Sequence, residues 1–170
     1  MPLIGIISKE NDSNFIKNSI IKISTNSKFE FININKNSLE NIKNITFETI
    51  IINENINEIL RNSNYINNII GRSKYLILNS DVCGNLKLLK DNEINILTFG
   101  LNSKATITVS SIKDDNILIC IQRNFKNISK ETIEEQEFNI KINKNNIKKT
   151  YNILAIYSVL SVYGEKYKNI

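Results

Sequence analysis

The chain has 170 residues, and 41% of them are hydrophobic, which suits a single domain that buries its own core. Its net charge is +5, but the basic residues are scattered and are not interleaved with stacking aromatic side chains. Nucleic acid is therefore not an expected partner. No apolar run is long enough to cross a bilayer, and the first residues lack the features of a signal peptide. We expect one cytoplasmic domain that spans residues 1–170 and has no membrane partner.

Two residue types limit the chemistry that this chain can perform. Histidine is absent, which removes the usual general base at neutral pH and the commonest zinc ligand. Cys83 and Cys120 stand at no metal-ligand spacing, and we expect both to be free thiols without a redox role. We accordingly expect no metal site and no cofactor.

The first half of the chain alternates short apolar runs with segments of helical periodicity, which is typical of βαβ units and a mostly parallel sheet. The predicted strands are residues 3–7, 29–34, 49–52, 75–78 and 95–99. Asp12 or Ser13 is predicted to cap a helix that extends to Ile23. A second helix is predicted from about Ile56 to Gly71, where glycine favours termination.

After Gly100 the pattern changes to alternation of apolar and polar residues, which indicates antiparallel strands. Residues 106–109 and 117–121 are predicted to form a hairpin with a turn at 114–116, and residues 138–142 are predicted to form a third strand. The apolar face of the last helix consists of Ile153, Ile156, Tyr157 and Leu160. The predicted fold class is α/β, with a mostly parallel sheet flanked by helices and a small antiparallel sheet extension.

Three blocks of sequence occur in an order that is found in a known family. Residues 75–81 end in Asn79-Ser80-Asp81, and residues 96–100 end in Thr-Phe-Gly. The last helix contains Asn152, Leu154, Ala155 and a closing Gly164. These blocks resemble the Asn-Ala-Asp strand, the Thr-Phe-Gly strand and the His-Asn-x-x-Asn-x-Leu-Ala-Ala segment in the central, ATPase domain of the Mur ligases, which join amino acids to peptidoglycan precursors. The resemblance implies a P-loop-type fold with the layout of that domain.

The segments that would carry the family's chemistry differ from its pattern. The family binds ATP phosphates with Gly-x-x-Gly-Lys-Thr after its first strand, whereas this chain reads Ser8-Lys9-Glu10-Asn11-Asp12, with two carboxylates and no glycine. The family's Asp-His pair aligns with Asn57 and Glu58, and Lys74 is expected to be a surface residue rather than the family's modified lysine. At 170 residues the chain is also too short for the family's three domains. We therefore expect an isolated, degenerate domain without catalytic residues, that is, a pseudoenzyme.

Two asparagines remain as candidates for nucleotide binding. Asn152 matches the family's second Asn, a position that the resemblance implies contacts the nucleotide base, although a structural role at the start of the helix also explains it. Asn79 stands at the carboxyl end of a predicted parallel strand, where open α/β sheets bind ligands. It is an equally good turn former.

Two functions are consistent with these features. The main hypothesis is a catalytically inactive Mur ligase-like protein that acts as an interaction or regulatory module in cell-wall or spore-wall biology, with no nucleotide required. The alternative is a nucleotide or nucleotide-sugar sensor without hydrolysis, which requires a cavity near Asn152. We expect a protein partner or a homo-oligomer, with contact through a sheet edge or through the last helix at Tyr157 and Tyr163.

Overall fold

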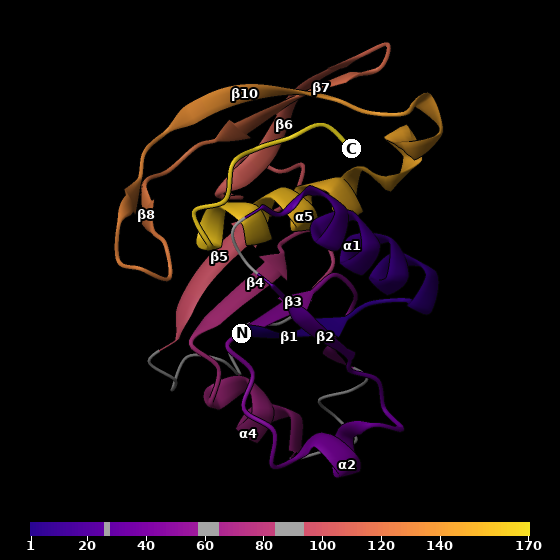
Figure 1. Ribbon diagram of the computed structural model, residues 1–170, viewed down its shortest axis with the longest axis vertical. Helices are drawn as coiled ribbons and strands as arrows, with labels where there is room; N and C mark the ends of the chain where they lie inside the picture. Colours follow the sequence, from indigo (N-terminus) through magenta and orange to yellow (C-terminus); the bar gives the residue numbers. More distant parts are fainter. Residues whose placement is uncertain (26–27, 58–64, 84–93) are drawn as a thin grey trace.

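The computed structural model describes residues 1–25, 28–57, 65–83 and 94–170, and its main feature is a single large sheet. In this part of the chain the sheet has eight strands in the order β10-β7-β6-β5-β4-β3-β1-β2 (Figure 1). These strands are β1 (Leu3–Ile7), β2 (Glu30–Asn33), β3 (Thr49–Ile52), β4 (Tyr75–Asn79), β5 (Asn95–Phe99), β6 (Ile107–Lys113), β7 (Asn116–Ile121) and β10 (Gln136–Lys141). Two short strands, β8 (Phe125–Lys126) and β9 (Thr132–Ile133), form a separate antiparallel pair.

Strand direction divides the large sheet into two parts. Strands β1 to β6 are all parallel, whereas β7 is antiparallel to both of its neighbours, β6 and β10. The predicted α/β fold class, a mostly parallel sheet flanked by helices with a small antiparallel extension, is therefore confirmed. The predicted hairpin is also present, with its turn at Asp114, where φ is 54°.

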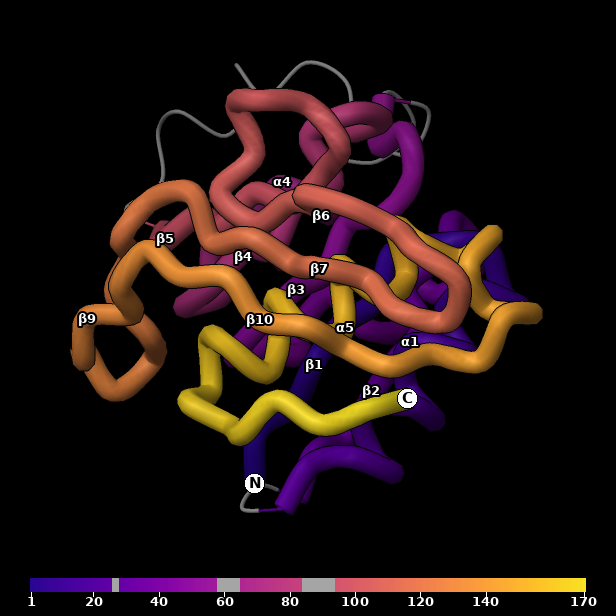
Figure 2. Tube along the Cα trace, turned by 90° about the horizontal axis from the view of Figure 1, so that it is seen from above, coloured from indigo at the N-terminus to yellow at the C-terminus, as the bar shows by residue number. Residues whose placement is uncertain are grey.

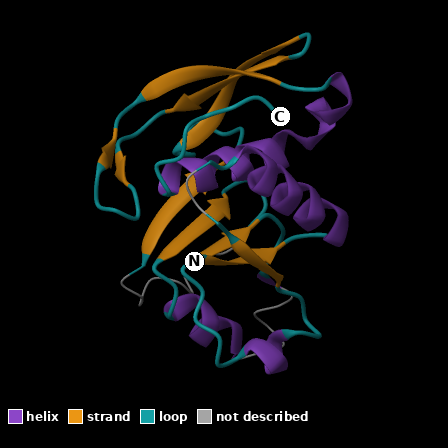
Figure 3. Cartoon of the chain, viewed as in Figure 1, coloured by secondary structure: helices purple, strands orange, loops and turns teal. Residues whose placement is uncertain are grey.

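Helices cover both faces of the parallel strands (Figure 3). On one face, α1 (Glu10–Ile23) and α5 (Thr150–Val162) pack on alternate strand residues such as Ile4 and Ile77. On the other face, α2 (Leu39–Ile42) and α4 (Tyr65–Gly71) pack on the intervening residues, such as Ile50 and Leu76. Because side chains alternate across a strand, the continuous apolar runs that predicted the strands supply both cores.

Helix α5 is enclosed rather than laid on a surface. The antiparallel strands β6, β7 and β10 curl over its far side, as Figures 1 and 2 show, and Ile117, Ile119 and Ile140 join the same core as the helix. Every residue from Asn152 to Val162 is buried. A helix that is apolar on all sides requires such an environment. The short 3-10 helix η2 (Lys144–Lys149) connects β10 to it.

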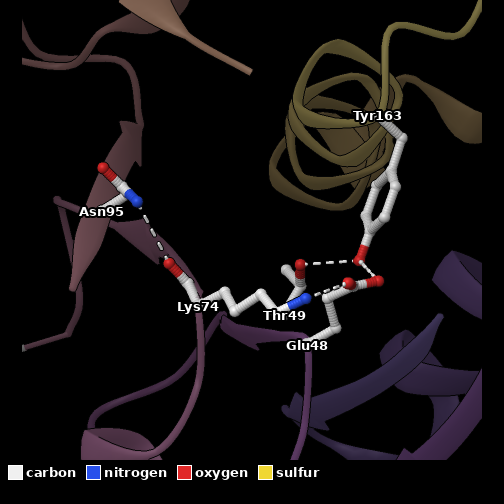
Figure 4. A network of polar contacts seen from close by, with 5 residues as sticks. All are labelled: Glu48, Thr49, Lys74, Asn95 and Tyr163. Atoms are coloured by element: carbon white, nitrogen blue, oxygen red, sulfur yellow. Dashed lines mark hydrogen bonds and ion pairs between the residues drawn. The ribbon is translucent and has the colours of Figure 1, made fainter. Parts of the chain in front are cut away.

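The prediction that the last helix offers an interaction surface is wrong at Tyr157, whereas Tyr163 is half-buried. Tyr157 is fully buried, and its hydroxyl donates a hydrogen bond to the carbonyl of Lys168. The hydroxyl of Tyr163 lies 2.8 Å from Thr49 Oγ1 and 3.5 Å from Glu48 Oε2 (Figure 4). Tyr157 is buried because the sheet curls over α5, whereas Tyr163 follows the helix and contacts the start of β3.

Element boundaries agree with the sequence for three strands and differ at the first helix. Strands β1, β3 and β5 have the predicted bounds. Helix α1 begins at Glu10 with Lys9 as its N-cap, so Asp12 and Ser13 lie inside the helix and the predicted cap is wrong. None of the helices in the described ranges is long and apolar enough to cross a bilayer.

Candidate functional site

The strand order changes direction next to β1, and this point defines the candidate site. The chain continues from β1 to β2 on one side and later places β3 on the other side. In open parallel sheets, ligands bind outside the carboxyl ends of the strands at such a switch point. The residues that follow β1, β3 and β4 at this edge are therefore the ones to inspect.

The connection from β1 to α1 is very short. Only Ser8 and Lys9 separate the end of the strand at Ile7 from the start of the helix at Glu10. The N–H groups of Asp12 and Ser13 already donate to the carbonyl of Lys9, at 3.0 and 2.9 Å. Glu10 and Asp12 occupy the first helical turn, where they interact favourably with the helix dipole. No extended loop of backbone N–H groups is present here to surround a phosphate.

Three asparagines and one aspartate form a hydrogen-bonded series at the same edge, which we call the amide relay. Asn79 Nδ2 donates to Asn53 Oδ1 at 2.8 Å, Asn53 Nδ2 donates to Asn152 Oδ1 at 2.7 Å, and Asn152 Nδ2 donates to Asp12 Oδ1 at 2.6 Å. The relay joins β4, the residue after β3, α5 and α1. Its direction is set by Asp12, because a carboxylate only accepts.

The structure thus brings the two predicted site residues, Asn79 and Asn152, into one network. They are 1% and 3% exposed, and the link between them is Asn53, which sequence reasoning missed. The only sequence signal for Asn53 is its position directly after a buried parallel strand. Each of the three amides uses one N–H within the relay and keeps a second.

A cavity of about 310 Å³ opens beside the relay. Its lining contains three lysines, two carboxylates, five polar or aromatic side chains and one valine: Lys9, Lys148, Lys149, Asp12, Glu54, Asn53, Asn55, Asn79, Tyr151, Asn152 and Val82. The ammonium group of Lys149 also lies 4.0 Å from the centre of the Phe15 ring, which orients that side chain over α1. The cavity required by the sensor hypothesis is therefore present near Asn152.

Asp81 fixes the turns that border the cavity. Burial raises the pKa of its carboxyl group, but hydrogen bonds from Asn102, the Leu101 N–H and Tyr151 outweigh this effect, so that its pKa is below the ordinary value. The Leu101 N–H lies 2.6 Å from Asp81 Oδ2. A Cβ atom at Gly100 would lie 2.9 Å from the same oxygen, so a larger residue there would displace the Asp81 side chain. The sequence blocks that end at Asp81 and Gly100 are thus packed against each other.

The remaining sequence candidates lie elsewhere or offer no metal site. Lys74 stands at the opposite end of the strands, where its ammonium group pairs with Glu48 at 2.9 Å and its side chain is 70% exposed, as expected for a surface residue. Glu58 lies outside the described residues, and Asn57 follows an Asn55 turn. In the described ranges no group of three His, Cys, Asp or Glu residues could hold a metal ion. Burial raises the pKa of both thiols, Cys83 and Cys120.

Comparison of the chain with models of known protein families finds no match. Comparison with curated proteins finds no significant match either. The resemblance to the Mur ligase central domain therefore depends on the three sequence blocks alone and stays a prediction.

Proposed function

We propose that this protein is a catalytically inactive relative of the Mur ligase central domain that acts as an interaction or regulatory module, in cell-wall or spore-wall biology. The observation that carries the proposal is the short connection from β1 to α1. Phosphoryl transfer from ATP depends on backbone N–H groups and a lysine that surround the phosphates. Here Ser8 and Lys9 lead directly into a helical turn that contains Glu10 and Asp12, whose negative charges oppose phosphate binding at that place.

The amide relay supports the same proposal. The amide groups of Asn79 and Asn152 are engaged with Asn53 and Asp12 and hold β4, α5 and α1 together. Buried side-chain amides are normally hydrogen-bonded within the protein, so the relay needs no ligand to explain it. A module that works by contact does not need turnover, and these hydrogen bonds hold the edge together without a bound ligand.

The test measures turnover and partner binding separately. Purified protein is assayed for ATP hydrolysis with Mg²⁺, and the expected result is no activity above the buffer rate. Proteins that co-purify from the native cell are then expressed alone and titrated against the chain by calorimetry. An ATPase activity that persists through purification and disappears in Asp12→Asn or Asp81→Asn would refute the pseudoenzyme, and failure of every candidate partner to bind directly would refute the interaction module.

A second function, a nucleotide or nucleotide-sugar sensor without hydrolysis, is favoured by the cavity of about 310 Å³ beside Asn152. Calorimetry with ATP, ADP and UDP-sugars, with and without Mg²⁺, distinguishes it from the first proposal. The sensor predicts binding that is weakened in Asn152→Ala and is unchanged in Asn139→Ala, a control at an exposed asparagine of β10. If none of these ligands gives a detectable binding signal, the sensor is refuted and only the interaction module remains.

A further inference from the structure

The charges around the cavity come from different elements. Lys9 lies between β1 and α1, and Lys148 and Lys149 lie in η2, directly before α5. In the described part of the chain, the ion pairs are formed by Lys74 and Lys141, so the three cavity lysines are not paired with carboxylates. These lysines line a concave site without a carboxylate partner among the described residues, and the ammonium group of Lys149 also lies 4.0 Å from the Phe15 ring. Ammonium groups in such a place attract an anion.

Two carboxylates limit how much negative charge the cavity accepts. Asp12 and Glu54 also line it, which leaves one positive charge in excess. One oxygen of Asp12 accepts the hydrogen bond from Asn152 at 2.6 Å, so this carboxylate stays at the site. A phosphate monoester carries about −1.5 to −2 at neutral pH, which already exceeds the excess positive charge of the lining, and each further phosphate increases the imbalance.

The volume of the cavity and its asparagine side chains indicate what the ligand contains besides a phosphate group. A volume of about 310 Å³ is at the lower end of the range for small-molecule sites. Asn53, Asn79 and Asn152 each keep an N–H that the relay does not use, and these groups suit a neutral body with hydrogen-bond acceptors.

We infer that the cavity binds a small ligand with a single phosphate group on a hydrogen-bonding body, and that Lys148 and Lys149 hold the phosphate. This inference deepens the sensor alternative and rests on the cavity that supports it. It differs from triphosphate binding after β1, because the lysines come from η2 and the carboxylates come from α1 and from the segment after β3.

The experiment titrates the full chain with inorganic phosphate and with AMP, ADP and ATP, without Mg²⁺, and follows the amide signals by NMR. The test variant is Lys148→Gln/Lys149→Gln. The control variant, Lys144→Gln/Lys166→Gln, removes the same charge from two exposed lysines that do not line the cavity. We expect phosphate to bind the wild type, with an affinity that falls at least roughly tenfold in the test variant and is unchanged in the control. We also expect ATP to bind no more tightly than AMP.

Several results would overturn the inference. The first is that no phosphate-bearing probe binds. The second is that the affinity for phosphate falls equally in both double variants or does not fall in the test variant. The third is an affinity that rises steadily from AMP to ATP. The nucleotide sensor can be refuted independently of the phosphate site. If phosphate binds through Lys148 and Lys149 while AMP and UDP-sugars bind no more tightly than phosphate, the phosphate site stands and the nucleotide sensor is refuted.

Discussion

Asn152→Asp tests the direction of the amide relay. Asn152 donates to Asp12 through Nδ2 at 2.6 Å and accepts from Asn53 through Oδ1 at 2.7 Å. A carboxylate at position 152 still accepts from Asn53, but its second oxygen faces Asp12 with no proton between them. Two like charges about 4 Å apart repel by roughly 4 kcal/mol at the effective dielectric constant of a protein surface. Because Asp12 is only partly buried, we expect the free energy of unfolding to fall by about 2–4 kcal/mol.

The expected signature of this variant is its pH dependence. One proton shared between the two carboxylates relieves the repulsion, so the folded-state pKa of the pair is raised above the unfolded value of about 3.9. A raised folded-state pKa gives stability that is present below about pH 4 and is lost as the pH rises through that pKa.

Urea unfolding at about pH 4 and about pH 8 measures the effect, with Asn152→Ala as the control. Relative to wild type, the aspartate variant should lose more stability at the higher pH, whereas the alanine variant should lose a similar amount at both. Equal losses of the aspartate variant at the two pH values would show that residue 152 does not donate to Asp12.

Three further predictions concern packing and one buried hydroxyl. Gly100→Ala should lower the free energy of unfolding by about 1–3 kcal/mol, because its Cβ would lie 2.7 Å from Ser80 Oγ. Gly71 is exposed, so Gly71→Ala is the control, and an equal loss of stability in both variants would contradict the prediction. Leu160→Ala should cost about 2–5 kcal/mol in urea unfolding because α5 is enclosed, and a loss below about 1 kcal/mol would argue against the enclosure. Burial raises the pKa of Tyr75 to about 12, so its contribution to stability is complete below about pH 10 and is lost as the pH rises through about 12. Spectrophotometric titration should show one fewer late-titrating tyrosine in Tyr75→Phe, and an unchanged titration curve would contradict the assignment.

The parallel strands were predictable because their signal is local. Strands β1 and β3 consist almost entirely of apolar residues and have the bounds expected from the sequence. A strand that is covered on both faces requires side chains of this kind at every position. The change to alternation after Gly100 also correctly indicated the hairpin, since β7 alternates between buried and half-buried residues.

Asp12 shows why the start of α1 was not predictable. Its side chain suits an N-cap, and the sequence offers no reason to place it further into the helix. In the structure its partner is Asn152, which is 140 positions away in the sequence. Asn53 was missed for the same reason, because its role depends on Asn79 and Asn152 rather than on its neighbours.

The last helix shows the same limit for packing. Its apolar pattern identified one buried face, but every residue from Asn152 to Val162 is buried. The second cover comes from β6, β7 and β10, which curl over the helix. A helix packed on one layer would have left Tyr157 near the surface, so the error about Tyr157 follows from the unpredicted curl of the sheet.

The proposed loss of turnover and the stability of the fold are linked through Asp12. A glycine-rich phosphate loop in place of residues 8–12 would remove this carboxylate, because the family's pattern has no acidic residue there. Asn152 Nδ2, which is buried, would then lose its acceptor, and the relay would lose the group that fixes its direction. A buried donor without a partner costs about 1–3 kcal/mol, a substantial part of the stability of a small domain. Under the proposed function, the residues that replace the phosphate loop are therefore part of the structure that joins α1 to α5, and restoring the loop alone would weaken that junction before it could bind ATP.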